Sequence, residues 1–180
     1  MTRALVLKMA VSLDGFVAAT DGSTGWAAVG RSDDGARWTV ETLSNAGAHL
    51  MGANAYAELA SYWPSASGPM AEAMNEIPKV VFSNSLGSAG WSDTTIAAGD
   101  LAAAVKRLKQ EPGDGYLLAH GGPRFARSLV GTGLIDEYRL VVHPVVLGAG
   151  EPLFTAPVTI EPRDTIVFSR GAVAHVFAAH

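Results

Sequence analysis

The sequence predicts an α/β protein with a mainly parallel sheet, helices on both faces of that sheet and an antiparallel pair of strands at one edge. Apolar runs typical of buried strands alternate with helical periodicity through the first two-thirds of the 180 residues. The last third carries strand patterns only. No internal repeat, low-complexity tract or linker interrupts this order. We therefore expect a single domain over residues 1–180.

The expected strands are short apolar runs, bounded mostly by Gly, Pro, Asn or Asp. The first covers residues 4–11 and contains one lysine, Lys8. Residues 138–147 form a long apolar strand before the glycines that follow it. The other strands are expected at residues 48–51, 79–83, 94–97, 116–119, 165–169 and 172–179.

Helical periodicity is expected over residues 33–46, 54–62 and 123–130, and again from residue 101 onward. Asp100 stands directly before this last helix, where its side chain can cap the first free N–H groups. Residues 63–78 contain three prolines, so we expect a long loop there with about one helical turn.

Charge and cysteine content exclude several classes of function. The net charge is −4 and the 13 Lys and Arg residues are scattered, whereas nucleic-acid binding requires a clustered basic face. Without cysteine, the chain has no disulfide, thiolate nucleophile or Cys-ligated zinc site. No histidine pair has a metal-binding spacing, so no metal is expected. No membrane-spanning run or signal-peptide pattern is present, and we expect a cytoplasmic protein without a membrane partner.

Small and polar residues gather where three expected strands end, at residues 51–55, 82–86 and 119–124. In open α/β sheets, ligands bind outside the carboxyl ends of the strands, where helix N-termini offer free N–H groups that suit a phosphate. Small residues also fill such turns without any ligand, so each junction alone is a weak signal. Three junctions at one sheet edge favour a phosphate-bearing ligand there.

Three further residues are candidates for chemistry. Lys8 lies within an apolar strand. Either its long side chain extends so that the ammonium reaches solvent, or the ammonium is a cation in a cleft with a lowered pKa. His120 stands at the sheet edge where we expect the ligand to bind. Asp14 precedes a glycine and is either a turn former or a ligand contact. The histidines expected within strands, which we predict to be satisfied or half-exposed, are His49, His143 and His175.

Five motifs occur in the order typical of a known group: K-M-A-V-S-L-D-G-F-V-A (8–18), L-M-G-A-N-A-Y (50–56), V-F-S-N-S-L (81–86), H-G-G-P-R-F-A-R-S-L (120–129) and L-I-D-E-Y-R-L-V-V-H-P-V-V-L-G-A-G-E-P-L-F (134–154). Through them the chain resembles the dihydrofolate-reductase-like superfamily. Within it, the chain is similar to bacterial proteins that resemble the C-terminal domain of RibD, the pyrimidine reductase of riboflavin biosynthesis. The resemblance covers nearly the whole chain and is specific for the superfamily rather than for one substrate.

The resemblance implies a three-layer dihydrofolate-reductase-like fold with a mixed, mostly parallel sheet of about eight strands. It implies NADPH, bound across the strand ends, a small-molecule substrate and a homodimer, in which residues 138–147 could pair or pack across a two-fold axis. It also implies a non-proline cis peptide at the His120–Gly121 bond. The implied cofactor contacts are Ala10, Val17, Gly52, Ala53, Asn54, Ala55, Ser83, Asn84, Ser85, Gly121, Gly122, Pro123, Arg124 and Phe125.

We therefore expect an NAD(P)H-dependent reductase that transfers hydride to a small C=N or C=O compound, such as a pterin- or pyrimidine-like heterocycle. Its expected catalytic residues are Lys8, Asp14 and His120. Relatives carry Arg or Lys where this chain has Ala53 and Arg where it has Asn84, so NADH is an open alternative to NADPH. The alternative functions are a nucleotide-binding protein of the same fold without reductase chemistry, and a flavin-binding protein.

Overall fold

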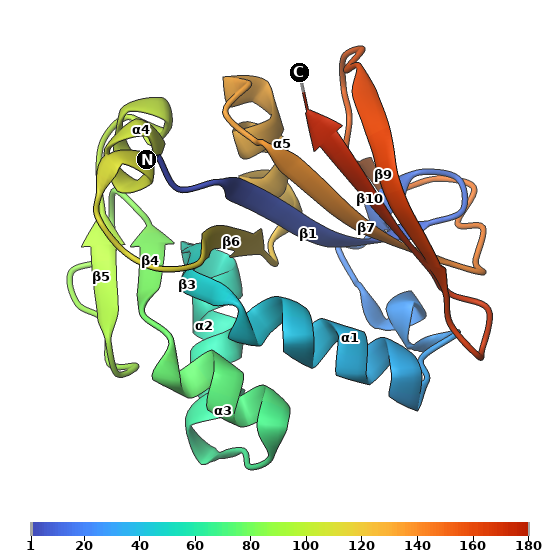
Figure 1. The fold of residues 1–180 in the computed structure, drawn as a ribbon, viewed down its shortest axis with the longest axis horizontal. Coiled ribbons are helices and arrows are strands. Elements are labelled where there is room, and N and C mark those ends of the chain that lie inside the picture. Colours follow the sequence, from blue (N-terminus) through green and yellow to red (C-terminus); the bar gives the residue numbers. More distant parts are fainter. Residues whose placement is uncertain (1, 180) are drawn as a thin grey trace.

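The computed structural model describes residues 2–179, which form three layers, as predicted (Figure 1). An eight-stranded sheet is the middle layer. One face of the sheet is covered by α4 (Leu101–Gln110) and α5 (Pro123–Thr132), and we name it the upper face. The opposite, lower face is covered by α1 (Asp33–Ser44), α2 (Ala53–Tyr62) and α3 (Pro69–Glu76).

The strand order across the sheet is β5-β4-β3-β6-β1-β7-β10-β9. All neighbouring pairs from β5 to β7 are parallel, and β10 is antiparallel to both β7 and β9. The strands are β1 (Leu5–Ser12), β3 (Ala46–Gly52), β4 (Lys79–Phe82), β5 (Thr94–Ala97), β6 (Tyr116–His120), β7 (Glu137–His143), β9 (Ile160–Val167) and β10 (Val173–Ala179). The expected fold class, a mostly parallel sheet with an antiparallel pair at one edge, is confirmed.

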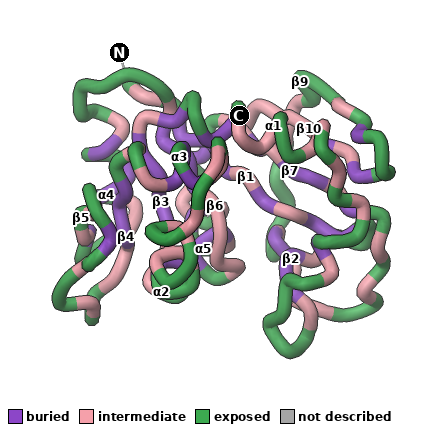
Figure 2. The backbone as a smooth tube through the Cα atoms, turned by 90° about the horizontal axis from the view of Figure 1, so that it is seen from below, coloured by how far each residue is buried: buried purple, intermediate pink, exposed green. Residues whose placement is uncertain are grey.

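Side chains alternate between the two faces along each strand. In β1, Leu5 joins the upper core together with Val105 of α4 and Leu129 of α5. Val6 joins the lower core with residues of α1, α2 and α3. Lys8 follows Val6 by two positions and therefore lies on the lower face. Buried stretches follow the central strands, whereas β9 at the sheet edge is mostly exposed (Figure 2).

Two short strands outside the main sheet, β2 (Phe16–Ala18) and β8 (Glu151–Pro152), are not predicted by the sequence. They pair antiparallel and fasten the segment after β1 to the loop after β7. A Cβ atom at Gly150 would lie 2.3 Å from the carbonyl oxygen of Ala18, so this approach requires glycine. Gly150 thus has a packing role at this contact.

The predicted cap of α4 is confirmed, because Oδ1 of Asp100 accepts a hydrogen bond from the amide of Ala103 at 2.8 Å. The prediction of a loop over residues 63–78 is wrong for the second half of that segment. The segment begins with the 3-10 turn η2 (Trp63–Ser65) and continues with the eight-residue helix α3. Pro69 takes the first position of α3, where no N–H is needed and the fixed φ angle suits a helix.

No helix within residues 2–179 is both long and apolar enough to cross a bilayer.

Strand β7 ends at His143, earlier than the expected end at residue 147. Pro144 follows and has no N–H to donate to the ladder. β7 lies between β1 and β10, so both of its edges are already paired. The expectation that this strand could pair with a second copy across a two-fold axis is therefore wrong, and its packing across such an axis stays a prediction.

Candidate active site

The carboxyl ends of β3 and β6 lie side by side, and each strand is followed by a helix, β3 directly and β6 after two glycines. Gly52 precedes α2 and Gly122 precedes α5. Gly121 and Gly122 have φ angles of 75° and 79°, and a Cβ atom at either glycine would lie 3.4 Å from the Cβ of Ala55. The structure therefore packs two of the three predicted junctions against each other at one sheet edge.

Neither of these helix starts has a side-chain cap. No side chain accepts a hydrogen bond at Gly52 of α2 or at Gly122 of α5. By contrast, Ser32 caps α1 and Asp100 caps α4. Open N–H groups at a helix N-terminus, together with the positive end of the helix dipole, favour an anion. Two such groups of donors lie next to each other here.

The peptide bonds of residues 2–179 are all trans, so the expected cis bond at His120–Gly121 is wrong. The tight turn from β6 into α5 is made by the positive φ angles of Gly121 and Gly122 instead. Glycine reaches this region of backbone conformation without the steric conflict that a Cβ atom causes. Pro123 then begins α5, as predicted.

The third predicted junction, residues 83–85, is a folded loop after β4. Oγ of Ser83 accepts from two backbone amides further along the loop, at 3.0 and 3.2 Å. Oδ1 of Asn84 accepts from the amide of Gly99 at 2.7 Å. The ring centroids of Phe82 and Phe125 are 5.1 Å apart, and this aromatic contact joins the junction to α5. The side-chain oxygens of Ser83 and Asn84 thus serve to shape the loop.

Lys8 lies on the lower face between two polar neighbours. Its Cα is paired with that of His120 in β6 on one side and with that of Arg139 in β7 on the other. Within the described chain its Nζ has no hydrogen bond or ion pair, and the buried unpartnered atoms are only the Nε1 atoms of Trp26 and Trp63. The Lys8 side chain is half-buried, so its unpartnered ammonium is partly accessible to a ligand. Burial lowers the pKa of Lys8 to about 8.

His120 contacts a second histidine from the neighbouring strand β3. Its Nε2 lies 3.1 Å from Nδ1 of His49, and the two rings meet edge to face with centroids 4.8 Å apart. His49 is fully buried, and its Nε2 lies 3.0 Å from the carbonyl oxygen of Ala73. Burial lowers the pKa of His49 to about 4 and that of His120 well below its usual value. Both rings are neutral at pH 7.

The contact between His49 and His120 has no third potential metal ligand beside it among the described residues. No group of three or more His, Cys, Asp or Glu side chains within residues 2–179 is placed to hold a metal ion. Sequence analysis placed His49 among the satisfied strand histidines, which is correct for its contact with Ala73 but misses its contact with His120. No local pattern marks that contact, because the two histidines lie 71 positions apart in the chain.

Asp14 lies exposed in the turn after β1, and its carboxylate binds other parts of the chain. Oδ1 accepts from the hydroxyl of Ser12 at 2.7 Å and from the amide of Leu147 at 3.1 Å, and Oδ2 accepts from the amide of Gly148 at 2.7 Å. These bonds, the one from Ser12 most strongly, lower the pKa of Asp14. An ionised carboxylate with these partners holds the loop after β7, which favours the turn-former alternative for Asp14.

The two residues expected beside the nicotinamide lie in different environments. Ala10 follows Lys8 by two positions, shares the lower face and is half-buried. Val17 is 2% exposed and packs into the upper core, so its side chain is enclosed. Arg124 is exposed in the first turn of α5, and no contact of its side chain is recorded within residues 2–179.

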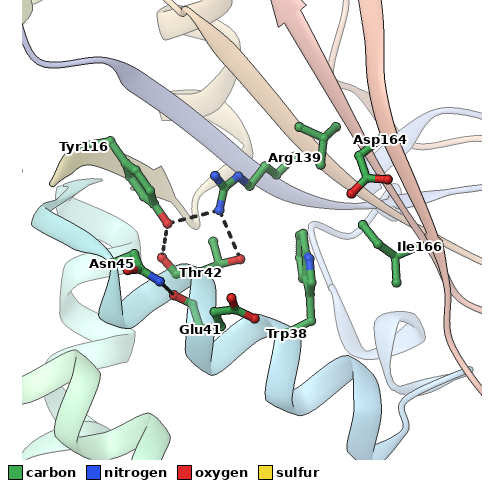
Figure 3. Close-up of a pocket in the computed structure, with 9 residues that line it drawn as sticks. Trp38, Glu41, Thr42, Asn45, Tyr116, Arg139, Asp164 and Ile166 are labelled. Carbon is green, nitrogen blue, oxygen red and sulfur yellow. Dashed lines mark hydrogen bonds between the residues drawn. The ribbon is translucent and has the colours of Figure 1, made fainter.

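A cavity of about 620 Å³ lies on the same face of the sheet as Lys8, next to Arg139 (Figure 3). Nη1 of Arg139 donates to the hydroxyl of Tyr116 at 3.0 Å and to Oγ1 of Thr42 at 3.3 Å, and Nε donates to Glu137 at 2.6 Å. These bonds hold the guanidinium as a fixed wall of the cavity. The other lining residues are Trp38, Glu41, Asn45, Asp164, Ile166 and Val176. Sequence analysis did not single out Arg139, whose only signal is its alternation along a strand.

Comparison with solved structures shows a dihydrofolate-reductase-like fold. The protein matches the dihydrofolate reductase of Enterococcus faecalis, solved with NADP(H), with a TM-score of 0.62 and 11% sequence identity over 98% of this chain and 96% of that chain. It matches a crystal structure from Shewanella sp. PV-4 with a TM-score of 0.77 and 21% identity, over 98% and 99% of the two chains.

Sequence comparison then shows the family. The chain is 28% identical to the Bacillus subtilis protein YyaP over 183 residues, which cover 97% of this chain and 94% of YyaP. Residues 3–171 match the RibD C-terminal domain. The protein therefore belongs to the RibD C-terminal domain family, a family of NADPH-dependent reductases. The resemblance drawn from the five motifs is confirmed.

Proposed function

We propose that this protein is an NAD(P)H-dependent reductase that transfers hydride to a small C=N or C=O compound, with pterin- and pyrimidine-like heterocycles as the substrate class. One observation carries the proposal. The uncapped N-termini of α2 and α5 meet at the sheet edge where β6 ends in His120, next to Lys8. A dinucleotide requires an anion site beside a reaction centre, and this edge offers both. Membership of the family supports the same activity.

The residues at this edge fit the diphosphate of a dinucleotide. The turn at Gly121 and Gly122 carries no side chain, so phosphate oxygens can approach the backbone at the uncapped start of α5. Arg124 adds an exposed cation and is the one Lys or Arg within residues 51–55, 82–86 and 119–124. Ala53 and Asn84 offer no cation to a 2′-phosphate, so the site supports NADH as well as NADPH.

A bound nicotinamide supplies the hydride, and the residues of this chain orient the substrate and supply the proton. The hydride adds to the carbon of the C=N or C=O group, and a proton adds to its nitrogen or oxygen. The products are the reduced compound and the oxidised cofactor. Lys8, whose pKa is lowered to about 8, is mostly protonated at pH 7 and can donate this proton. It regains a proton from solvent.

Titration calorimetry with NADPH and with NADH tests the proposal. We expect saturable binding of at least one of them, and no binding of either at millimolar concentration would overturn it. Gly122→Ala should weaken binding, because alanine is strained at a φ angle of 79° and the turn at the start of α5 must shift. Gly133→Ala is the matched control. It also replaces a glycine of positive φ, at the other end of α5, where nothing lies within 4 Å of the added atom.

Oxidation of NADPH across a panel of carbonyl, imine and pterin compounds then tests the chemistry. We expect turnover with at least one compound and its loss in Lys8→Met, because the proton donor is removed. Tight cofactor binding with no oxidation across the panel would contradict the reductase proposal. That result would favour the alternative, a nucleotide-binding protein of the same fold.

We further propose a homodimer, which the family resemblance supports. The strands at the two ends of the sheet, β5 and β9, each have one edge without a neighbouring strand among the described residues. Light scattering at two protein concentrations measures the assembly. A dimer mass at both is the expected result, and a monomer mass at both would contradict it.

A further inference from the structure

The contact between His49 and His120 belongs to a chain of hydrogen bonds, and the atom at its end fixes where each proton lies. The carbonyl oxygen of Ala73 can only accept, so Nε2 of His49, 3.0 Å away, carries a proton. A neutral imidazole has one N–H, so Nδ1 of His49 carries none and accepts a hydrogen bond. Nε2 of His120 lies 3.1 Å from that atom and therefore carries the proton of its own ring.

We infer that His49 is a positioning residue that fixes His120 in its Nε2–H tautomer, so that Nδ1 of His120 is an open hydrogen-bond acceptor in the site. The proton order follows from contacts within the protein itself. Its meaning for catalysis rests on the proposed function, which it deepens. The opposite order would place unprotonated Nε2 of His49 against the lone pairs of the Ala73 oxygen at 3.0 Å.

Nδ1 of His120 is free to meet a ligand. It has no hydrogen-bond partner within residues 2–179. His120 is the last residue of β6 and is half-buried, so its ring is partly accessible at the end of the strand.

The other end of the chain of hydrogen bonds is held in place. Ala73 belongs to the last turn of α3. The next two carbonyls of that turn, those of Met74 and Asn75, accept from Nζ of Lys79 at 3.2 and 2.8 Å. Lys79 itself is fully buried in β4, at the position paired with His49. The acceptor for His49 is therefore fixed by the core, and the orientation of both imidazoles follows from it.

The tautomer defines what His120 does in the site. Burial of both rings lowers their pKa values, so the pair stays neutral at pH 7 and Nδ1 of His120 accepts a hydrogen bond instead of donating one. Lys8, its neighbour across the parallel pair β1–β6, presents only donors. Together they fit a substrate edge that carries an N–H or O–H group beside an acceptor atom. The proton donor of the reaction is then Lys8.

Nitrogen-15 NMR of the imidazole rings tests the inference in the protein without cofactor or substrate at pH 7. We expect His120 and His49 each to show a protonated Nε2 and a bare Nδ1. His143 is an internal control of opposite sign. Its Nδ1 lies 2.8 Å from the carbonyl oxygen of Val29, which again can only accept, so His143 should carry its proton on Nδ1.

Two variants separate the positioning role from a general effect on folding. In His49→Leu the acceptor is gone, and His120 should become a mixture of tautomers. In His49→Asn the amide oxygen takes the place of Nδ1, and the Nε2–H form should return. A His120 that carries its proton on Nδ1 in the wild type, or whose signals are the same in His49→Leu, would overturn the inference. If His49→Leu does not fold, the wild-type spectrum decides alone.

A kinetic measurement extends the test to the proposed reaction. His49→Leu should raise KM for the compound that accepts the hydride at least about twofold, because the acceptor tautomer of His120 is then only a fraction of a mixture, and leave KM for NADPH unchanged. His49→Asn should restore the wild-type KM. An altered tautomer with an unchanged KM would overturn the positioning role. Because the spectra need no turnover, failure of the reductase proposal would be seen separately from failure of this inference.

Discussion

His49 of β3 and Lys79 of β4 occupy paired positions, and both side chains bind carbonyl oxygens in the last turn of α3. A helix leaves its final carbonyls without intrahelical partners, and its C-terminal end favours a cation. Lys79 supplies that cation to the carbonyls of Met74 and Asn75, and its Nζ lies 4.8 Å from the ring centroid of Trp91. These two buried polar side chains make the end of α3 part of the core.

Lys79→Met should destabilise the fold, because it leaves these carbonyls without their donor in a fully buried place. We expect a loss of about 1–3 kcal/mol in the free energy of unfolding, measured by urea denaturation. Lys106→Met is the matched control, since Lys106 is exposed on α4 and its loss should change stability by less than about 0.5 kcal/mol. An unchanged or higher midpoint for Lys79→Met would contradict this role of the ammonium.

Acid should destabilise the protein through His49. Its pKa is about 4 in the fold against 6.5 in the unfolded chain, so the unfolded chain binds more protons between these two pH values. Stability should therefore be full above about pH 6.5, fall as the pH drops, and lose no more through this residue below about pH 4. The charged or titratable groups that act on His49 are His120 and Lys79.

The pH effect is measured by denaturant unfolding of the wild type and of His49→Asn between pH 4 and pH 7. The shift corresponds to at most about 3 kcal/mol. The wild type should lose more stability over this window than the variant, which has no imidazole to protonate at that position. Equal pH dependence of the two proteins would contradict the depressed pKa.

Gly150→Ala should disrupt the contact between β2 and β8. The added Cβ would lie 2.3 Å from the carbonyl oxygen of Ala18, so the backbone must move, at an expected loss of about 2–3 kcal/mol. Gly131→Ala serves as the control of opposite sign. It lies within α5 with nothing within 4 Å of the new Cβ, and should gain about 0.5–1 kcal/mol. Thermal denaturation measures both, and equal midpoints would show that the close approach does not matter.

Asp14→Asn separates a loop anchor from a catalytic acid. Asparagine keeps one acceptor oxygen and turns an NH2 group toward the amide that the second oxygen bound, so Leu147 and Gly148 should exchange their amide hydrogens faster. Hydrogen exchange followed by NMR measures this effect. Unchanged exchange together with a large loss of turnover would instead indicate that Asp14 acts in the chemistry.

Arg124→Gln should weaken cofactor binding about tenfold, and by a similar factor for NADPH and NADH, because both carry the diphosphate. Arg170→Gln is the control for the loss of one positive charge. Arg170 is exposed in the turn between β9 and β10, which are separated from β6 by β1 and β7 in the sheet. Calorimetric titration measures both variants. Equal affinities of Arg124→Gln and the wild type would remove Arg124 from the site.

The elements that the sequence predicts correctly carry their signal locally. The apolar run of β1, the Asp100 cap of α4 and the glycine turn before Pro123 each depend on neighbouring residues. Helix α3 was expected to be a loop because of its prolines, although Pro69 stands where a helix tolerates it. Strands β2 and β8 are too short to show a period and exist only through their mutual pairing.

The residues of the candidate site likewise fall into those that a local sequence pattern predicts and those that only the fold brings together. The three junctions and Lys8 are visible as local patterns, and the structure brings Ala55 to Gly121 and Gly122 as the strand order requires. The bond between His49 and His120 depends on the pairing of β3 with β6 and has no trace in either segment alone. The role of Asp14 was left open by its turn pattern, because only the folded loop supplies the amides that its carboxylate binds.

A crystal structure with NADPH tests the central claim most directly. The account predicts the diphosphate against the backbone amides at the start of α5, with the nicotinamide toward Lys8 and His120. A cofactor whose diphosphate lies away from the N-termini of α2 and α5, or a site that stays empty at saturating NADPH and NADH, would contradict it.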